Sequence, residues 1–156
     1  MKFAAVITLA LLVVSCHHEK AASAETATAP DPCALISTDD LRRITGFAAK
    51  EGETTGDEKS AHRCTWHEGG EAGAGVITIT IHVENLDRLM GQLRNIPMSE
   101  PLSGLGDEAY WNNALNQLTM RSGARVITIS FNSSGGATDH RNAAIEIAKL
   151  ILPKLT

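Results

Sequence analysis

The sequence predicts a single α+β domain in which helices pack on one face of an antiparallel sheet of about five strands. Its two clearest strand segments alternate apolar and polar residues, which excludes a parallel sheet covered on both faces. Helical segments also alternate irregularly with closely spaced strands, in the expected order α-β-β-α-β-β-β-α with one disulfide. About 120 residues follow Ser37, which suffices for one hydrophobic core and not for two.

The expected globular domain covers residues 31–156 and begins with a short helix. Ser37 opens a capping-box pattern and Gly46 suits a C-terminal cap, so we expect a helix over about residues 38–45. Residues 50–60 are charged and contain glycine, which indicates a loop or a weak edge strand.

Two strand segments follow, separated by a glycine-rich connection. Residues 63–67 predict a short strand that carries Cys64 and Trp66. Residues 76–83, with the sequence VITITIHV, form the clearest strand, because their β-branched side chains alternate with a period of two.

The middle of the chain predicts an amphipathic helix and then an extended connection. Asn85 is placed to cap a helix over about residues 86–95. The stripe that this helix would pack on the sheet consists of Leu86, Leu89, Met90 and Leu93. Residues 95–105 contain two prolines and predict an extended loop that leads into a short strand segment at residues 109–111.

The last part of the chain predicts two strands and a terminal helix. The strands cover about residues 115–121 and 125–131 and are joined by a glycine-containing turn. Thr138 is placed to cap a helix that ends at about residue 151, and Pro153 prevents its extension. The expected inner stripe of this helix consists of Ala144, Ile147, Ala148 and Ile151.

Two of the expected strands have a polar face. If these strands are neighbours in the sheet, their polar side chains form a broad surface for a ligand. A solvated outer face is the simpler interpretation, and on it His82 would be exposed to solvent. The side chains in question are Thr78, Thr80, His82, Thr128 and Ser130.

The first 16 residues, MKFAAVITLALLVVSC, have the features of a secretory signal peptide: a basic residue, an apolar run and a small residue before the end. The apolar run of twelve residues is shorter than the roughly 20 that a membrane-spanning helix needs. Its ending resembles a bacterial lipobox, in which the cysteine, here Cys16, receives lipid and the chain is cut before it. Residues 1–15 would then be removed. Cleavage near Ala21 to Ala24 is the alternative.

Residues 16–30 are polar and contain proline, so we expect a flexible tether between the lipid and the domain. Two or three acyl chains would hold the protein on a membrane essentially permanently. His17 follows the cysteine where some bacterial lipoproteins have aspartate. By analogy with Gram-negative lipoproteins, we expect the cell envelope, and the periplasmic side of the outer membrane where the organism has one.

The two other cysteines form an even pair. In an exported protein the surroundings are oxidising, so we expect Cys33 and Cys64 to be bonded to each other. A reactive thiol or a metal site is the alternative, because Cys64 lies between His62 and His67. Side chains alternate along a strand, however, so His67 would point away from the other two.

Composition and motifs limit the function. Removal of residues 1–15 takes away Lys2 and no acidic residue, so the formal charge changes from -4 to -5 and nucleic acid is not an expected partner. The chain contains no phosphate-binding loop, dinucleotide fingerprint, zinc-protease motif or nucleophile elbow. We therefore expect no enzymatic activity, catalytic residues, cofactor or metal. A periplasmic hydrolase is a weak alternative, because catalytic triads are defined by geometry.

One acidic and aromatic stretch is a candidate recognition patch: Asp107, Glu108, Tyr110 and Trp111. Aromatic side chains supply contact area and carboxylates select basic groups on a partner. The alternative is structural, with a turn acid and aromatic side chains that cover the end of the sheet.

The chain resembles a family of bacterial cell-envelope lipoproteins of unknown function, best represented in actinobacteria. The resemblance covers residues 31 to about 152 and depends on the order of three short motifs after the lipobox. These motifs are Asp31-Pro32-Cys33, Cys64-Thr65-Trp66 and Gly106-Asp107-Glu108-Ala109. It implies the disulfide and a compact α+β domain, and it implies no known activity.

We therefore expect a membrane-anchored envelope lipoprotein that acts as a non-enzymatic binding or accessory module, with a protein or another envelope component as its partner. The alternative is a tethered inhibitor or immunity lipoprotein that blocks a periplasmic cell-wall hydrolase or toxin. Residues 100–108 are the candidate acidic loop for that role.

Overall fold

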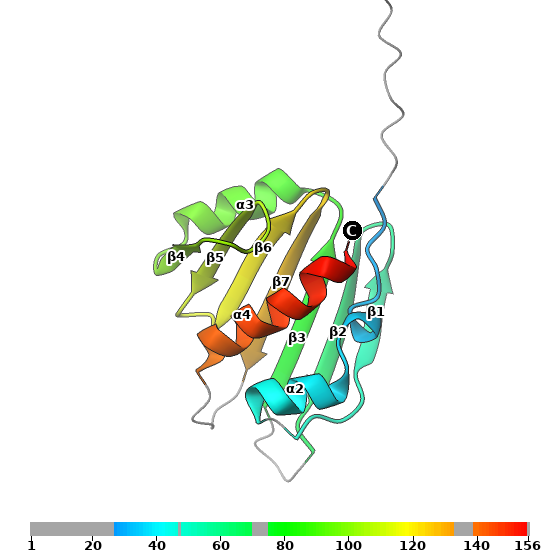
Figure 1. The fold of residues 1–156 in the computed structure, drawn as a ribbon. Coiled ribbons are helices and arrows are strands. Elements are labelled where there is room, and N and C mark those ends of the chain that lie inside the picture. Colours follow the sequence, from blue (N-terminus) through cyan, green and yellow to red (C-terminus); the bar gives the residue numbers. More distant parts are fainter. Residues whose placement is uncertain (1–26, 47, 70–74, 133–138, 156) are drawn as a thin grey trace, which may run out of the picture.

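The computed structural model describes residues 27–46, 48–69, 75–132 and 139–155 (Figure 1). Its centre is a seven-stranded antiparallel sheet in the order β1-β2-β3-β7-β6-β5-β4. The strands are β1 Glu53–Asp57, β2 Ala61–His67, β3 Val76–His82, β4 Ser99–Leu102, β5 Glu108–Asn112, β6 Gln117–Ser122 and β7 Arg125–Asn132. The helices are α1 Pro32–Leu35, α2 Thr38–Thr45, α3 Leu86–Asn95 and α4 His140–Ile151, followed by a 3-10 turn, Leu152–Lys154.

The sheet consists of two meanders that meet at its centre. Strands β1 to β3 form one meander and β4 to β7 form the other, and β3 pairs with β7. Helix α3 carries the chain from β3 to the far edge, where β4 begins (Figure 1). The expected antiparallel α+β fold is therefore confirmed. The predictions of about five strands and of the element order were wrong, because the sheet has seven strands and the chain has an additional helix, α1.

Strands β1 and β4, which the expected element order lacks, lie at the two edges of the sheet. Of the two interpretations of residues 50–60, the weak edge strand is the one that the structure shows. All five residues of β1 are exposed, so this strand has no buried alternation to reveal it. Strand β4 has four residues and contains Pro101, which a strand tolerates at an edge because its outer backbone groups need no partner. Edge strands with little apolar content also resist pairing with other chains.

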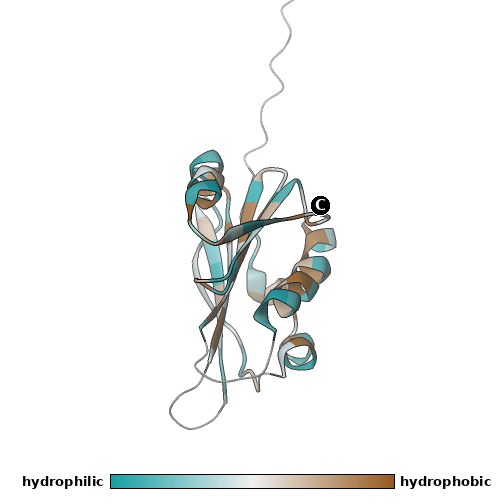
Figure 2. Ribbon diagram, turned by 90° about the vertical axis from the view of Figure 1, so that its left-hand side faces the viewer, coloured by the Kyte–Doolittle hydropathy of each residue, from teal (hydrophilic) through white to brown (hydrophobic). Residues whose placement is uncertain are grey.

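The helices cover both faces of the sheet, which corrects the expectation that they share one. Figure 2 shows the sheet nearly edge-on, with α3 on one side and α2 and α4 on the other. The larger core lies between the sheet and α1, α2 and α4. A second, small cluster joins Met90 and Leu93 of α3 to Val126 of β7. The apolar stripe of α3 was predicted correctly, but the sequence did not indicate which face it covers.

The local signals for the helix ends are confirmed in part. Ser37 accepts a hydrogen bond from the Asp40 amide, and Gly46 ends α2 in the left-handed conformation. Asn85 precedes α3, but its side chain makes no capping hydrogen bond. Asp139 caps α4, and Thr138 lies outside the described residues. The expected inner stripe of α4 is fully buried.

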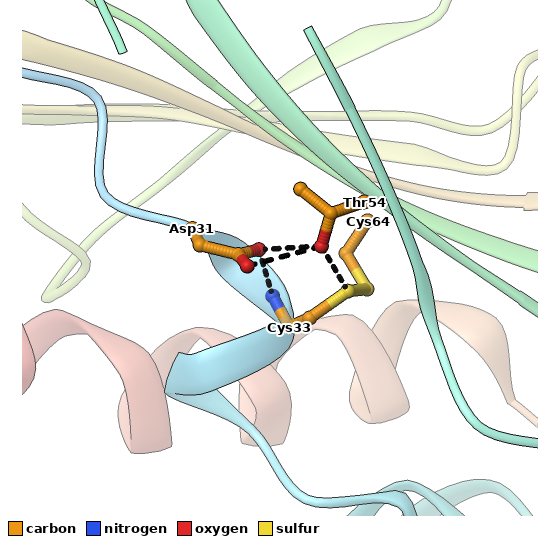
Figure 3. Close-up of a disulfide and its surroundings, with 4 residues drawn as sticks. All are labelled: Asp31, Cys33, Thr54 and Cys64. Atoms are coloured by element: carbon orange, nitrogen blue, oxygen red, sulfur yellow. Dashed lines mark hydrogen bonds between the residues drawn. A yellow bond between two sulfur atoms is a disulfide. The ribbon is translucent and has the colours of Figure 1, made fainter. Parts of the chain in front are cut away.

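The disulfide between Cys33 and Cys64 fastens the one-turn helix α1 to strand β2 (Figure 3). Asp31 caps α1 by accepting a hydrogen bond from the Cys33 amide. The Thr54 hydroxyl in β1 donates to the same carboxylate at 3.0 Å. Pro32 is in the first helical turn, where its missing amide hydrogen costs nothing. The Asp-Pro-Cys motif is therefore a junction between α1 and the first two strands.

Gly52 packs flat against this junction. A Cβ atom at this position would lie 2.5 Å from the Cys64 Sγ and 2.6 Å from the Trp66 Nε1. Trp66 is buried in the larger core, so neither neighbour can move away easily.

No helix within the four described ranges is both long and apolar enough to cross a membrane. The expected signal peptide, residues 1–15, the lipidation residue Cys16 and most of the expected tether lie outside those ranges.

We predict that Gly52→Ala lowers the free energy of unfolding by about 1–3 kcal/mol, because the added methyl overlaps the disulfide and the Trp66 ring. The matched control is Gly91→Ala in α3, where nothing lies within 4 Å of the new atom. It should raise the free energy of unfolding by about 0.5–1 kcal/mol, as expected for alanine in a helix. Urea unfolding measures both values, and equal effects would contradict the close packing of Gly52.

Candidate binding face

The strand order makes the two polar strand faces neighbours. Thr78 pairs with Ser130 and Thr80 with Thr128 across β3 and β7. Side chains directly opposite each other in an antiparallel pair lie on the same face. The condition for a broad polar surface is therefore met, and we name this surface the hydroxyl face. It consists of Arg63, Thr65, Thr78, Thr80, Thr128 and Ser130.

Helix α3 covers only part of this side of the sheet. It contacts β4, β6 and β7, at one side of the molecule (Figures 1 and 2). Within the described residues, no helix lies over the same side of β1, β2 and β3. The hydroxyl face therefore adjoins α3 on one side and is open to solvent on the other.

Arg63 is the cation of the hydroxyl face, and no motif in the sequence marks it as a site residue. Its side chain is exposed, and its Nε donates to the Thr80 hydroxyl at 3.3 Å. Thr80 is 6% exposed and lies in β3, between β2 and β7. In the described part of the chain, no carboxylate forms an ion pair with Arg63. An arginine on the polar side of an alternating strand was the available signal.

His82 lies beside Arg63 and is half-buried, which corrects the expectation that it is solvated. Burial lowers the pKa of His82 below its usual value, and the positive charge of Arg63 lowers it further. The imidazole is therefore neutral at pH 7. Among the described residues of the hydroxyl face, Arg63 therefore carries the one full positive charge.

A cleft of about 170 Å³ lies between α3 and the sheet. One of its walls is formed by Leu89, Gln92 and Leu93 of α3 and by Ile96, which directly follows the helix. Its floor is formed by Gln117, Thr119, Val126 and Thr128. The Gln117 amide donates to Thr119, and the hydroxyls of Thr119 and Thr128 lie 3.4 Å apart. The cleft thus combines apolar walls with hydroxyl groups, as small-molecule sites commonly do.

Two ion pairs hold α3 on the sheet. Arg94 makes two hydrogen bonds of 2.7 Å to the Glu108 carboxylate, which also accepts from the Tyr110 hydroxyl. Asp87 accepts from Arg121 at 2.6 Å. The hydrogen bonds from Arg94 and Tyr110 lower the pKa of Glu108 to about 2. We name the Arg94–Glu108–Tyr110 group the α3 clasp.

The four residues of the expected recognition patch do not form one surface. Glu108 and Tyr110 belong to the α3 clasp. Asp107 accepts a hydrogen bond from the Gly123 amide and so fixes the turn between β6 and β7. Trp111 is 3% exposed and points into the larger core, on the opposite side of the sheet from Tyr110. Each of the four therefore has a structural role.

The cysteine–histidine cluster that was the alternative to a disulfide does not form, because Cys64 is bonded to Cys33. A disulfide sulfur is not a thiolate and does not act as a zinc ligand. His67 is exposed, and Cys64 is buried. Across the described ranges, no group of three or more metal-ligating side chains is close enough together to hold a metal ion.

We predict that Glu108→Gln lowers the free energy of unfolding at pH 7 by on the order of 1 kcal/mol, because Arg94 loses its charged partner. The pKa of Glu108 is lower in the folded protein than in the unfolded chain. Its contribution is therefore complete above the unfolded pKa and is lost as the pH falls towards 2. Between about pH 5 and pH 2, the wild type should lose stability more steeply than the variant.

Urea unfolding across this pH range tests the prediction. Glu100→Gln is the matched control, because Glu100 is an exposed acid of β4 without a described hydrogen bond or ion pair. The same pH slope in wild type and Glu108→Gln would contradict the role of the clasp.

Comparisons with models of protein families, with curated proteins and with solved structures give no match to this chain. The expected membership of an envelope lipoprotein family therefore stays a prediction. The hydroxyl face, the cleft and the α3 clasp are the structural features that bear on function.

Proposed function

We propose that this protein is a lipid-anchored lipoprotein of the cell envelope, and that it is a non-enzymatic module that binds another envelope component on its hydroxyl face. Its N-terminal signal and Cys16 support the anchor. The observation that carries the binding function is Arg63, an exposed cation with no acidic partner among the described residues, in a field of aligned hydroxyl groups.

The position at which the chain enters the domain is compatible with a tether. The Ala29 amide donates to the Glu58 carbonyl, and the Arg125 Nε donates to the Thr28 carbonyl. Both contacts lie at the end of the sheet that carries the β1–β2 and β6–β7 turns. An N-terminal anchor therefore leaves the hydroxyl face, on the side of the sheet, uncovered by the point of attachment.

The inhibitor hypothesis has less support from the geometry. It requires a rigid acidic loop whose carboxylates are free to enter the cleft of an enzyme. Asp107 and Glu108 both accept hydrogen bonds within the domain, and only Glu100 of the expected loop has an unengaged carboxylate in the described structure. The binding module is therefore the function that we propose.

The anchor predicts that the mature protein begins at Cys16 and carries acyl chains. Intact-mass measurement of the protein from membranes should show the added lipid, and Cys16→Ser should abolish labelling with radioactive palmitate. Ser15→Ala is the control, because it keeps a small residue before the cysteine and should leave labelling intact. A mature chain that begins beyond Cys16 would refute the anchor.

The binding face predicts where a partner contacts the domain. A photoreactive amino acid at Thr65 or Thr78 should form crosslinks to an envelope component in living cells, because both side chains lie on the hydroxyl face. The same residue at Glu146 or Lys149, exposed on α4, should form none. Equal yields at all four positions would argue against a binding function for this face.

A further inference from the structure

The cleft and the hydroxyl face share one row of paired residues, which we name the track. Arg63, Thr80, Thr128 and Thr119 are successive partners in a single row across strands β2, β3, β7 and β6. Thr128 and Thr119 line the cleft, and Arg63 binds Thr80. The row therefore leads from an exposed cation, over hydroxyl groups, into a partly apolar space.

Helix α3 is asymmetric in a way that leaves this space accessible. Asp87 and Arg94, seven residues apart, lie on the same side of the helix and make both of its ion pairs with the sheet. Leu89 and Ile96, also seven residues apart, lie on the other side and line the cleft. The helix is thus fastened along one edge, and the cleft runs along the opposite edge, towards the hydroxyl face.

The size and charge of the track limit what it can accept. A cavity of about 150 Å³ accommodates a benzene molecule, so a cleft of about 170 Å³ holds an apolar group of roughly six carbons. Two strand spacings of about 4.8 Å place the Arg63 backbone roughly 10 Å from that of Thr128. Arg63 presents its guanidinium next to a neutral His82 and without an ion pair among the described residues.

We propose that the track binds an amphiphile with an anionic head group and a short apolar chain. The Arg63 guanidinium binds the anion, the hydroxyls of Thr80 and Thr128 lie beneath the polar part, and the apolar chain enters the cleft beside Leu89 and Ile96. This inference rests on the proposed binding function of the hydroxyl face and names the class of ligand. An uncharged or wholly polar ligand would leave either Arg63 or the apolar wall without a partner.

The test uses the full chain in lipid nanodiscs and octanoate as the probe, with empty nanodiscs as the blank. Methyl NMR signals of Leu89, Leu93 and Val126 should shift on addition of octanoate. Butyrate, which is too short to reach the cleft from Arg63, and 1-octanol, which lacks the charge, should each bind about fivefold more weakly.

Two pairs of variants locate the site. Thr128→Ile fills the cleft and should weaken octanoate binding about tenfold. Thr28→Ile is the matched control, because Thr28 is exposed where the chain enters the domain and lies outside the cleft and the hydroxyl face, and it should leave octanoate binding within about twofold. Arg63→Gln should weaken octanoate binding about fivefold and leave 1-octanol unaffected. Arg88→Gln, on the outer side of α3, is the control for charge and should change neither.

Each outcome decides the proposal. Absence of shifts at the cleft methyls, or equal binding of octanoate and 1-octanol in wild type and Arg63→Gln, would overturn it. Crosslinks from Thr65 and Thr78 together with a silent cleft would mean that the hydroxyl face binds another class of ligand, so that the binding function stands and the amphiphile fails. Octanoate binding without crosslinks would mean that the track accepts an amphiphile, and that the proposed binding of an envelope component on this face is wrong.

Discussion

Helix α3 is held on the sheet by a small apolar contact between Met90, Leu93 and Val126 and by the bidentate pair of Arg94 and Glu108. The apolar contact is smaller than the core on the other side of the sheet. The ion pair therefore matters more for the orientation of α3 than a surface pair usually does, because its two hydrogen bonds fix direction as well as distance. The uncovered hydroxyl face and the cleft both exist because α3 is fastened in this position.

The attachment of α3 to the sheet also explains the motif Gly106-Asp107-Glu108-Ala109. Gly106 has a positive φ of 62°, and a Cβ there would meet the Arg121 carbonyl oxygen. Asp107 then binds the β6–β7 turn, Glu108 binds α3, and Ala109 is buried in the larger core. Four consecutive residues thus connect the sheet, a turn and a helix. Their order in the sequence reflects this junction and does not by itself indicate a ligand site.

The sequence predicted the elements that carry a periodic apolar signal. The strand VITITIHV, the stripe of α3 and the inner stripe of α4 all have such a signal, and each is found. The exposed strand Glu53–Asp57 has none, and its pairing with β2 places Thr54 beside Asp31, next to the disulfide. The face that α3 covers could not be predicted either, because it depends on a contact between residues 90 and 126 that no local pattern contains.

In the candidate site, too, local patterns predicted some residues, and the rest depend on contacts between distant parts of the chain. Alternation along β3 and β7 identified the threonine and serine side chains, but their meaning depended on whether the two strands were neighbours. The acidic and aromatic residues at positions 107–111 predicted a recognition patch, but in the fold their side chains make contacts within the domain. Arg63 was not predicted as a site residue, because a single arginine in a short strand is common. Its importance comes from what surrounds it: Thr80 beneath it, His82 kept neutral beside it, and no described carboxylate within ion-pair distance.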